Sequence, residues 1–353
     1  MVSDDLVPAA GEHTNSMTGE IELSVVVPVY NEEANIGPFL SRVVPILEES
    51  AASYEMIFCV DPSSDATEQT LAEARRANPK IKYVVFSRRF GQPAAVLAGV
   101  ELAAGRGVVV IDVDLQDPPE LIPEMLRMWR DGYDVVYGQR TGRRGETVIK
   151  RFVSAFGYRL ISRLSDVEIP PHTGDFRLMD RRVVDQLRTL PESHGFLRGL
   201  VALVGYRQGP VTFERSARHA GTGKYNRFFG SMKIGLNGLI GFSSALLDLS
   251  TLLGFVAAVG AFVLAVAYAG FKFAGVHFPV GNPTIVVLIL LIGGLQLICL
   301  GIAGQYLGRI YEEVKHRPRY IIDRVEGIDA SAPSRVGPIR ERTVTVAPAA
   351  RRS

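Results

Sequence analysis

Residues 108–120 read VVVIDVDLQDPPE, an apolar run that ends in three aspartates, Asp112, Asp114 and Asp117. Continuous Val and Ile residues are typical of a strand that is buried on both faces of a parallel sheet. Carboxylates are costly to bury unless they are paired or bound to a cation. The stretch therefore predicts a buried parallel strand whose carboxyl end carries a polar site that attracts cations.

Apolar strands alternate with amphipathic helices across residues 23–140. The expected strands are LSVVVPVY, YEMIFCVD, IKYVVFS, GVVVIDVD and DVVYGQR, and the expected helices cover residues 33–49, 65–77, 93–104 and 119–130. This alternation predicts an α/β domain whose mostly parallel sheet is covered by helices on both faces. Ligands bind such sheets at the carboxyl ends of the strands, where we expect Tyr30, Glu32, Asp61 and Asp112.

Asp112 and Asp114 are two residues apart, so their side chains share a face of an extended segment. Such a pair suits Mg²⁺ or Mn²⁺, because Mg²⁺ binds one or two carboxylates together with substrate phosphates. The alternative is a solvated turn at the end of the strand, since a D-x-D pair is common. Asp117 precedes Pro118, and Glu120 follows three residues later, so we expect Asp117 to cap the next helix.

Two long segments near the end of the chain, residues 249–271 and 284–307, carry no charged residue. Each exceeds the roughly 20 residues that a helix needs to cross a bilayer. We therefore expect a transmembrane hairpin rather than two buried helices of a soluble core, which usually keep a polar stripe. Basic residues flank its outer ends, whereas the connecting loop offers only Lys272. The positive-inside rule then places the N-terminal domain and the tail in the cytoplasm.

Charge, cysteine content and the N-terminal sequence argue against a nucleic-acid-binding protein, a disulfide-stabilised protein and a signal peptide. The chain has 353 residues and a net charge of +2, which gives no overall attraction to nucleic acid. Its two cysteines, Cys59 and Cys299, are far apart, which argues against a disulfide framework. The N-terminus is acidic and has no apolar run, so we do not expect a signal peptide. Gly293 and Gly294 allow close packing between membrane helices, so a homo-oligomer is one expectation.

Five motifs together resemble glycosyltransferase family 2 with a GT-A-type, Rossmann-like fold: SVVVPVYNEE, VDPSSDAT, DVDLQDPPE, GDFRLMDR and RHAGTGKY. Over residues 22–320 the chain resembles more narrowly the polyprenyl-phosphate glycosyltransferases, such as the bactoprenol glucosyltransferases, the aminoarabinose-lipid synthases and dolichol-phosphate mannose synthase. This resemblance implies an inverting enzyme of the bacterial inner membrane that transfers a hexose from a nucleotide sugar to polyprenyl phosphate for cell-envelope glycosylation. Glucose from UDP-glucose is the first expectation; UDP-aminoarabinose derivatives, UDP-N-acetylhexosamines and GDP-mannose stay open.

The residue pattern and the resemblance together predict the organisation of the chain. We expect a disordered leader at 1–20, a cytoplasmic GT-A catalytic domain at 21–222, a loop with interfacial amphipathic helices at 223–248, transmembrane helices at 249–271 and 284–307, a cytoplasmic juxtamembrane segment at 308–327 and a disordered tail at 328–353.

The family pattern implies roles for individual residues. On the donor side, the nucleotide sugar would contact Pro28, Tyr30, Glu32, Asp61 and Asp112, with Gln92 expected at a neighbouring strand-to-helix turn. The metal and the diphosphate would be held by Asp112, Asp114 and Gln116.

Asp175 matches the aspartate that is usually proposed as catalytic in the family. A phosphate monoester is already largely an anion at neutral pH, so we expect Asp175 to orient the acceptor or to steady positive charge, with proton removal second. A turn carboxylate that caps the helix from about residue 181 is the alternative. The expected ligands of the lipid phosphate are Arg177, Arg215, Arg218, Lys224 and Tyr225. Simple attraction of these basic residues to anionic lipid is the competing interpretation.

Two other functions compete with this one. A processive polysaccharide synthase would carry a Q-x-x-R-W motif, but the single tryptophan is Trp129, in an expected helix. A catalytically inactive protein that binds a lipid-linked sugar is the rival from another class, and the presence of Asp112, Asp114 and Asp175 argues against it.

Overall fold

The structure, a computed structural model, describes residues 21–141, 170, 173–190, 197–214, 243–275 and 283–328. In its first part, strands and helices alternate: β1 (Leu23–Val29), α1 (Glu33–Ser50), β2 (Tyr54–Val60), α2 (Thr67–Ala77), β3 (Ile81–Phe86), α3 (Gln92–Leu102), β4 (Gly107–Val110), the short 3-10 helix η1 (Pro119–Leu121), α4 (Ile122–Arg130) and β5 (Val135–Arg140). The expected alternation over residues 23–140 is thus confirmed.

The later elements are β6 (Thr173–Asp180), α6 (Arg181–Thr189), α7 (Leu197–Val204), β7 (Gln208–Phe213), α9 (Ala245–Phe273), α10 (Pro283–Val314) and β8 (Ile322–Glu326). The strands form one eight-stranded sheet in the order β7-β5-β6-β4-β1-β2-β3-β8. The central strands β4, β1, β2 and β3 are parallel, as are β5 and β7, whereas β6 and β8 run antiparallel to their neighbours. The mostly parallel sheet predicted from the sequence is confirmed.

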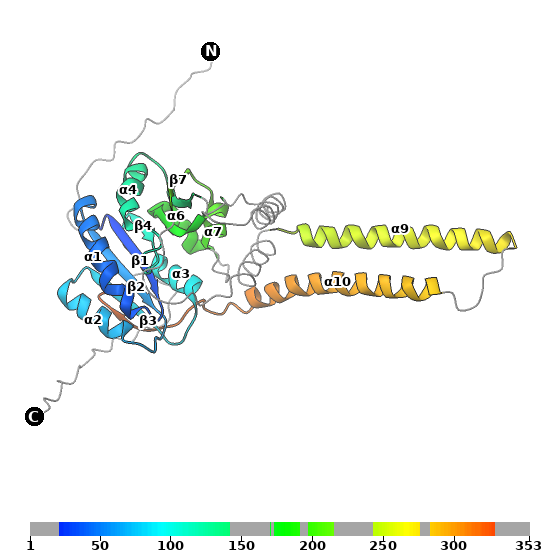
Figure 1. The fold of residues 1–353 in the computed structure, drawn as a ribbon, viewed down its shortest axis with the longest axis horizontal. Coiled ribbons are helices and arrows are strands. Elements are labelled where there is room, and N and C mark those ends of the chain that lie inside the picture. Colours follow the sequence, from blue (N-terminus) through cyan, green and yellow to red (C-terminus); the bar gives the residue numbers. More distant parts are fainter. Residues whose placement is uncertain are drawn as a thin grey trace, which may run out of the picture.

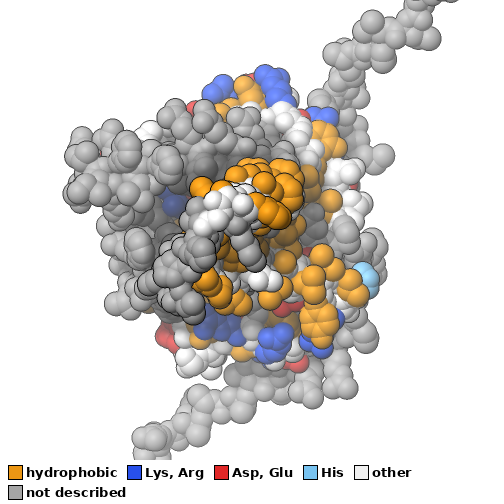
Figure 2. Space-filling model, turned by 90° about the vertical axis from the view of Figure 1, so that its right-hand side faces the viewer, with side chains coloured by type: hydrophobic (Ala, Val, Ile, Leu, Met, Phe, Trp, Pro, Cys, Tyr) orange, Lys and Arg blue, Asp and Glu red, His pale blue; other side chains and the backbone are white. Residues whose placement is uncertain are grey.

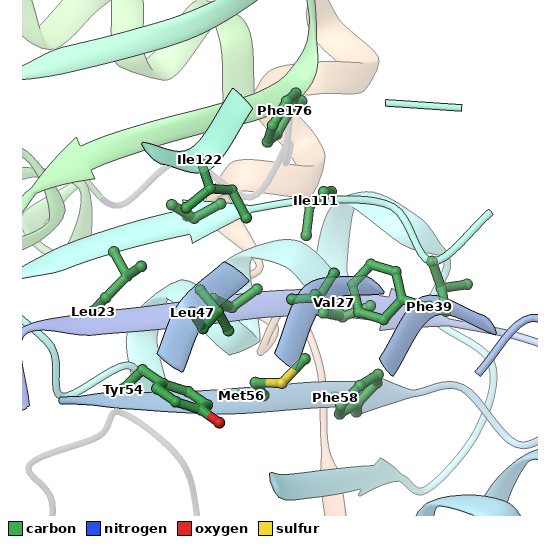
Figure 3. Close-up of a cluster of buried hydrophobic side chains, with 14 of the residues drawn as sticks. Leu23, Val27, Phe39, Leu47, Tyr54, Met56, Phe58, Ile111, Ile122 and Phe176 are labelled. Atoms are coloured by element: carbon green, nitrogen blue, oxygen red, sulfur yellow. The ribbon is translucent and has the colours of Figure 1, made fainter. Parts of the chain in front are cut away.

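Both faces of the sheet are covered by helices. Successive side chains of the central strands point to opposite faces, so each face carries its own apolar cluster. Val25 and Val27 of β1 belong to one apolar cluster, which includes residues of α1, α2 and α4. Val26 belongs to the other cluster, which includes residues of α3, α6 and α7. The first cluster is built around large side chains such as Phe39 of α1 and Phe58 of β2, whose rings meet edge to face (Figure 3). Burial of one such side chain contributes roughly 1.5–3 kcal/mol.

Helices α9 and α10 pack against each other as a hairpin that projects from one side of the α/β domain (Figure 1). Their segments Leu246–Phe271 and Leu288–Val314 are long and apolar enough to cross a membrane. Large apolar side chains face outward along both helices, for example Phe262 and Leu290. Figure 2, which looks along the hairpin toward the domain, shows hydrophobic side chains grouped at the centre and Lys and Arg side chains toward the rim. The two spans predicted from the sequence lie within these helices.

The chain returns to the sheet after the hairpin. Residues 322–326, which the sequence placed in a juxtamembrane segment, form β8 at the edge of the sheet beside β3. Periodicity did not indicate this strand, because its partner β3 lies far away in the chain and nothing local to residues 322–326 specifies the pairing.

Candidate active site

The register of β4 and β6 joins two regions that are distant in the chain. These strands are antiparallel, and Val110 pairs with Arg177. Continuing this register past the end of β4 carries Asp112 toward Asp175, near the start of β6. Asp112 and Asp175 interact electrostatically in the structure. The carboxyl end of β4 and the amino end of β6 therefore form one edge, where the expected metal-binding and catalytic aspartates meet.

The turn after β4 holds its aspartates by local bonds. Oδ1 of Asp112 accepts a 2.9 Å hydrogen bond from the side-chain amide of Gln92, at the start of α3. Oδ1 of Asp114 accepts a 3.1 Å bond from the backbone N–H of Gln116. Leu115, between them, has a φ of 57°, in the left-handed region that residues other than glycine rarely adopt. Backbone strain of this kind costs about 1–3 kcal/mol and clusters at functional sites.

The prediction that Asp117 caps a helix is wrong. The structure assigns no side-chain cap to η1 or α4, and Pro118 occupies the cap position of η1. Asp117 is buried and pairs with Arg140 at the end of β5, with Nη2 and Oδ1 3.1 Å apart. Glu120, expected to complete a capping box, pairs instead with Arg42 of α1. The local pattern predicted that Asp117 and Glu120 would cap a helix, but both carboxylates form ion pairs with arginines from other elements instead.

The carboxylates at this edge crowd one another. Burial, followed by the nearby charges of Asp175, Asp117 and Asp114, raises the pKa of Asp112 to about 8, although the charge of Arg140 opposes this rise. A cation would relieve this repulsion, so the residues fit a divalent metal. Among the described residues, no three His, Cys, Asp or Glu side chains converge as a complete cage. Magnesium sites that are completed by substrate phosphates need only one or two protein carboxylates.

Asp175 is held by an arginine that the sequence did not single out. Nε of Arg198, on α7, lies 2.9 Å from Oδ1 of Asp175, and Nη1 of Arg198 donates a 2.9 Å bond to the carbonyl of Thr173. Burial alone would raise the pKa of Asp175, but Arg198 and then Arg177 and Arg140 hold it below its usual value. Asp175 is therefore a carboxylate at neutral pH. The alternative that it caps α6 is excluded, because Asp180 makes that cap.

Arg177 follows Asp175 by two residues on β6. It is buried, and its Nη2 donates a 2.9 Å hydrogen bond to the carbonyl of Gly174. Burial lowers the pKa of Arg177 to about 10, and Asp175 counteracts part of this effect. The guanidinium thus remains positive at neutral pH. The other expected ligands of the lipid phosphate, Arg215, Arg218, Lys224 and Tyr225, lie outside the residues that the structure describes.

The first two strands end beside a loop that we call the donor loop, residues 87–92, which runs from the end of β3 to the first residue of α3. Both carboxylate oxygens of Asp61 accept 2.9 Å bonds from this loop, one from the N–H of Phe90 and one from the N–H of Gly91. Gly91 has a φ of +91°, which explains why glycine stands there. Asp61 thus shapes the expected nucleotide pocket by holding the loop.

The remaining donor-side residues lie at the end of β1. Tyr30 is covered by the guanidinium of Arg89 from the donor loop, whose Cζ lies 4.0 Å from the ring centre. Glu32 accepts a hydrogen bond from the side chain of Asn35. Pro28 is buried within β1, opposite Cys59 of β2. The structure thus brings the predicted donor-side residues to one edge of the sheet, and it adds Arg89, Arg140 and Arg198, for which no local motif gave a signal.

The sequence is similar to a known protein family and, over most of its length, to known proteins. Residues 24–188 match the model of glycosyl transferase family 2. An uncharacterized glycosyltransferase of Synechocystis sp. is 44% identical over 314 residues, which cover 88% of this chain and 97% of the relative. The bactoprenol glucosyl transferase of Shigella phage SfV is 38% identical over 303 residues, which cover 86% of this chain and 98% of the relative.

Among solved structures, glucosyl-3-phosphoglycerate synthase from Mycobacterium tuberculosis, in complex with Mn²⁺, UDP-glucose and phosphoglyceric acid, is 20% identical, with a TM-score of 0.42, and the match covers 66% of this chain and 87% of that one. The full-length relatives and the family match, together with the aspartate-lined edge of a mostly parallel sheet, lead to one assignment: this chain belongs to glycosyltransferase family 2 and is a glycosyltransferase of the GT-A fold.

Proposed function

We propose that this enzyme transfers glucose from UDP-glucose to polyprenyl phosphate, with inversion, at the cytoplasmic face of the bacterial inner membrane. The observation that carries the proposal is the meeting of Asp112 and Asp175 at one sheet edge, in a domain that is continuous with a long apolar hairpin. The relatives named bactoprenol glucosyl transferase support the choice of sugar and acceptor.

The donor would bind along the ends of β1, β2 and β4. Tyr30 and Asp61 lie on the base side, and Asp112 and Asp114 lie on the diphosphate side. Asp112, Asp114 and Gln116 are the residues that would hold Mg²⁺ or Mn²⁺. When bound, such an ion neutralises negative charge on a departing diphosphate.

The reaction needs one in-line displacement. An oxygen of the lipid phosphate forms a bond to the anomeric carbon, and the bond from that carbon to the diphosphate breaks, so that UDP leaves. Asp175 stays ionised beside Arg198, which suits a carboxylate that stabilises developing positive charge or orients the acceptor. No second carboxylate nucleophile is required for inversion.

The acceptor would reach this site from the bilayer. Its prenyl tail favours hydrocarbon, so its phosphate head must meet the donor near the membrane surface. Arg177 is a buried cation at the site edge, and Arg215, Arg218, Lys224 and Tyr225 precede α9 in the chain, where a lipid head would be presented. We propose that these residues bind that phosphate, and that the hairpin anchors the enzyme with both termini in the cytoplasm.

Incubation of the purified full-length protein in nanodiscs with polyprenyl phosphate and a panel of nucleotide sugars tests the proposal. We expect a lipid product whose mass corresponds to one added hexose with UDP-glucose, and none with the Asp114→Asn protein as the control for contaminating activity. A product formed only from GDP-mannose or a UDP-N-acetylhexosamine would show that the donor is wrong. Binding of nucleotide sugar without any product would favour the inactive binding protein.

A further inference from the structure

The segment that follows the hairpin reaches the donor side of the site. We call residues 319–326 the return segment; they follow α10 and include β8. Val84 of β3 pairs with Val325, and Phe86 with Ile322. At the first position of the donor loop, the N–H of Ser87 donates a 2.9 Å bond to the carbonyl of Ile321. Figure 1 shows this orange chain running from α10 back to the sheet beside β3.

Tyr320 connects the return segment to the donor loop through one intermediate side chain, Phe86. Its ring is buried, and its centre lies 5.8 Å from that of Phe86, the last residue of β3. Phe86 in turn meets Phe90 of the donor loop edge to face, at 6.1 Å. The Tyr320 hydroxyl donates to Glu101 of α3, which also pairs with Arg319 at 3.5 Å. Tyr320 is therefore held at two points, by Glu101 at its hydroxyl and by Phe86 at its ring, and Phe86 passes the contact on to Phe90 of the loop.

The donor loop itself is connected to both parts of the nucleotide-sugar site. Its backbone binds the carboxylate of Asp61, and the Gln92 side chain binds Asp112. A shift of the loop would therefore move groups on the base side and on the diphosphate side together. The loop is short, and the described contacts that fix its beginning come from Phe86 and the return segment.

We propose that Tyr320 is a positioning residue of the donor site, which holds the donor loop in the conformation that accepts the nucleotide sugar. This inference rests on the proposed use of the site for a nucleotide-sugar donor. It also means that the return segment connects the membrane hairpin to the donor pocket, so that the hairpin has a function besides anchoring the enzyme. Preorganisation of this kind lowers the ordering cost of binding, so loss of Tyr320 should weaken the donor complex specifically.

The competing explanation is that Tyr320 only fastens β8 to the sheet. Arg324 provides a control for this, because it belongs to β8 itself. Its side chain pairs with Glu68 of α2 rather than with the donor loop. Arg324→Ala therefore loosens β8 without removing a contact to the loop. Tyr320→Phe keeps the ring against Phe86 and loses only the bond to Glu101, so it provides a mild variant that should fold.

The test compares Tyr320→Ala, Tyr320→Phe and Arg324→Ala in the full-length protein. The first measurement is hydrogen exchange of peptides that cover residues 87–92 without nucleotide. We expect about tenfold faster exchange in Tyr320→Ala, a smaller increase in Tyr320→Phe and wild-type exchange in Arg324→Ala. The second is the Kd of UDP-glucose with Mg²⁺ by calorimetry, which should rise about tenfold in Tyr320→Ala while the KM for polyprenyl phosphate stays unchanged.

Hydrogen exchange tests the positioning role of Tyr320, and the Kd of UDP-glucose also tests the proposed donor. Unchanged exchange in both Tyr320 variants, or an equal increase in Arg324→Ala, would overturn the positioning role. Should Tyr320→Ala not fold, Tyr320→Phe decides the matter by the same comparison with Arg324→Ala. If the wild-type protein does not bind UDP-glucose, the proposed donor is wrong, and the exchange measurement still decides whether Tyr320 positions the loop.

Discussion

Arg198 holds Asp175 through a 2.9 Å contact between its Nε and the Oδ1 of the carboxylate. The two residues come from different elements, α7 and β6. The second bond of Arg198, to the carbonyl of Thr173, fixes the guanidinium on the strand that carries Asp175. This arrangement fixes both the charge and the direction of the carboxylate, and it leads to the first two predictions.

Asp175→Asn should lower kcat by about 10²–10³-fold, because the amide keeps the shape of the side chain and removes the negative charge that the proposed mechanism places beside the reacting sugar. The Kd of UDP-glucose should change little. The measurement is steady-state transfer together with calorimetry. Asp131→Asn is the matched control, since Asp131 is an exposed carboxylate in an i,i+4 pair with Arg127, and it should behave as wild type. Near-normal kcat in Asp175→Asn would contradict the catalytic assignment.

Arg198→Ala should move the acidic limb of the pH–rate profile to higher pH. In the wild type, Arg198 is the largest influence that lowers the pKa of Asp175, against burial, which raises it. A lowered pKa means that Asp175 is protonated, and its contribution lost, only as the pH falls below its usual range. Without Arg198 this loss should set in at a higher pH. Arg198→Lys keeps the charge and should shift the limb less; identical profiles for all three proteins would show that Arg198 has only a structural function.

Asp114→Asn and removal of metal should have the same effect, a fall in turnover by orders of magnitude. The neutral side chain is a poorer ligand for a hard cation, and the leaving diphosphate then keeps its charge. Activity should vanish in excess chelator and return on addition of Mg²⁺ or Mn²⁺. The variant should also need more metal for half-maximal rate. Full activity in chelator would exclude a metal-dependent mechanism.

Asp117→Ala should cost more stability than the roughly 1 kcal/mol expected for loss of a helix cap. Asp117 is buried against Arg140, and breaking a buried ion pair from one side costs about 3–5 kcal/mol. Denaturant unfolding of Asp117→Ala, Arg140→Ala and the double variant measures this. We expect the double variant to be less destabilised than the sum of the two single variants. Strictly additive effects would mean that the pair is not coupled.

Glu55→Ala should destabilise the domain by about 3–5 kcal/mol without changing the chemistry. Glu55 is buried on β2, where it accepts bonds from the hydroxyl of Ser24, the ammonium of Lys82 and the N–H of Ala104. This network lies near the amino ends of the strands, away from the site. The checks are the melting temperature and kcat at a temperature where the variant stays folded. A large fall in kcat there would contradict the separation of the two ends.

Local sequence determined the framework of this protein. The strands and helices from β1 to α4 follow from hydrophobic period and length, since each buries its own apolar face against the sheet. The hairpin follows from two uncharged segments long enough to span a bilayer. The positions of Asp61, Asp112 and Asp114 followed as well, because parallel strands present their carboxyl ends at one edge. None of these features needs knowledge of which distant strand is a neighbour.

Tertiary structure alone decided the pairings. Strand β6 enters the sheet antiparallel between β4 and β5, and only this brings Asp175 to Asp112. The partner of Asp117 is Arg140 rather than the backbone of the next helix, because the fold buries that carboxylate beside a guanidinium from another strand. The return of residues 322–326 to β3 likewise depends on an unpaired sheet edge. These pairings depend on the free energy of burial and hydrogen bonding between segments that are far apart in the chain. The local hydrophobic period of a segment carries no information about that free energy.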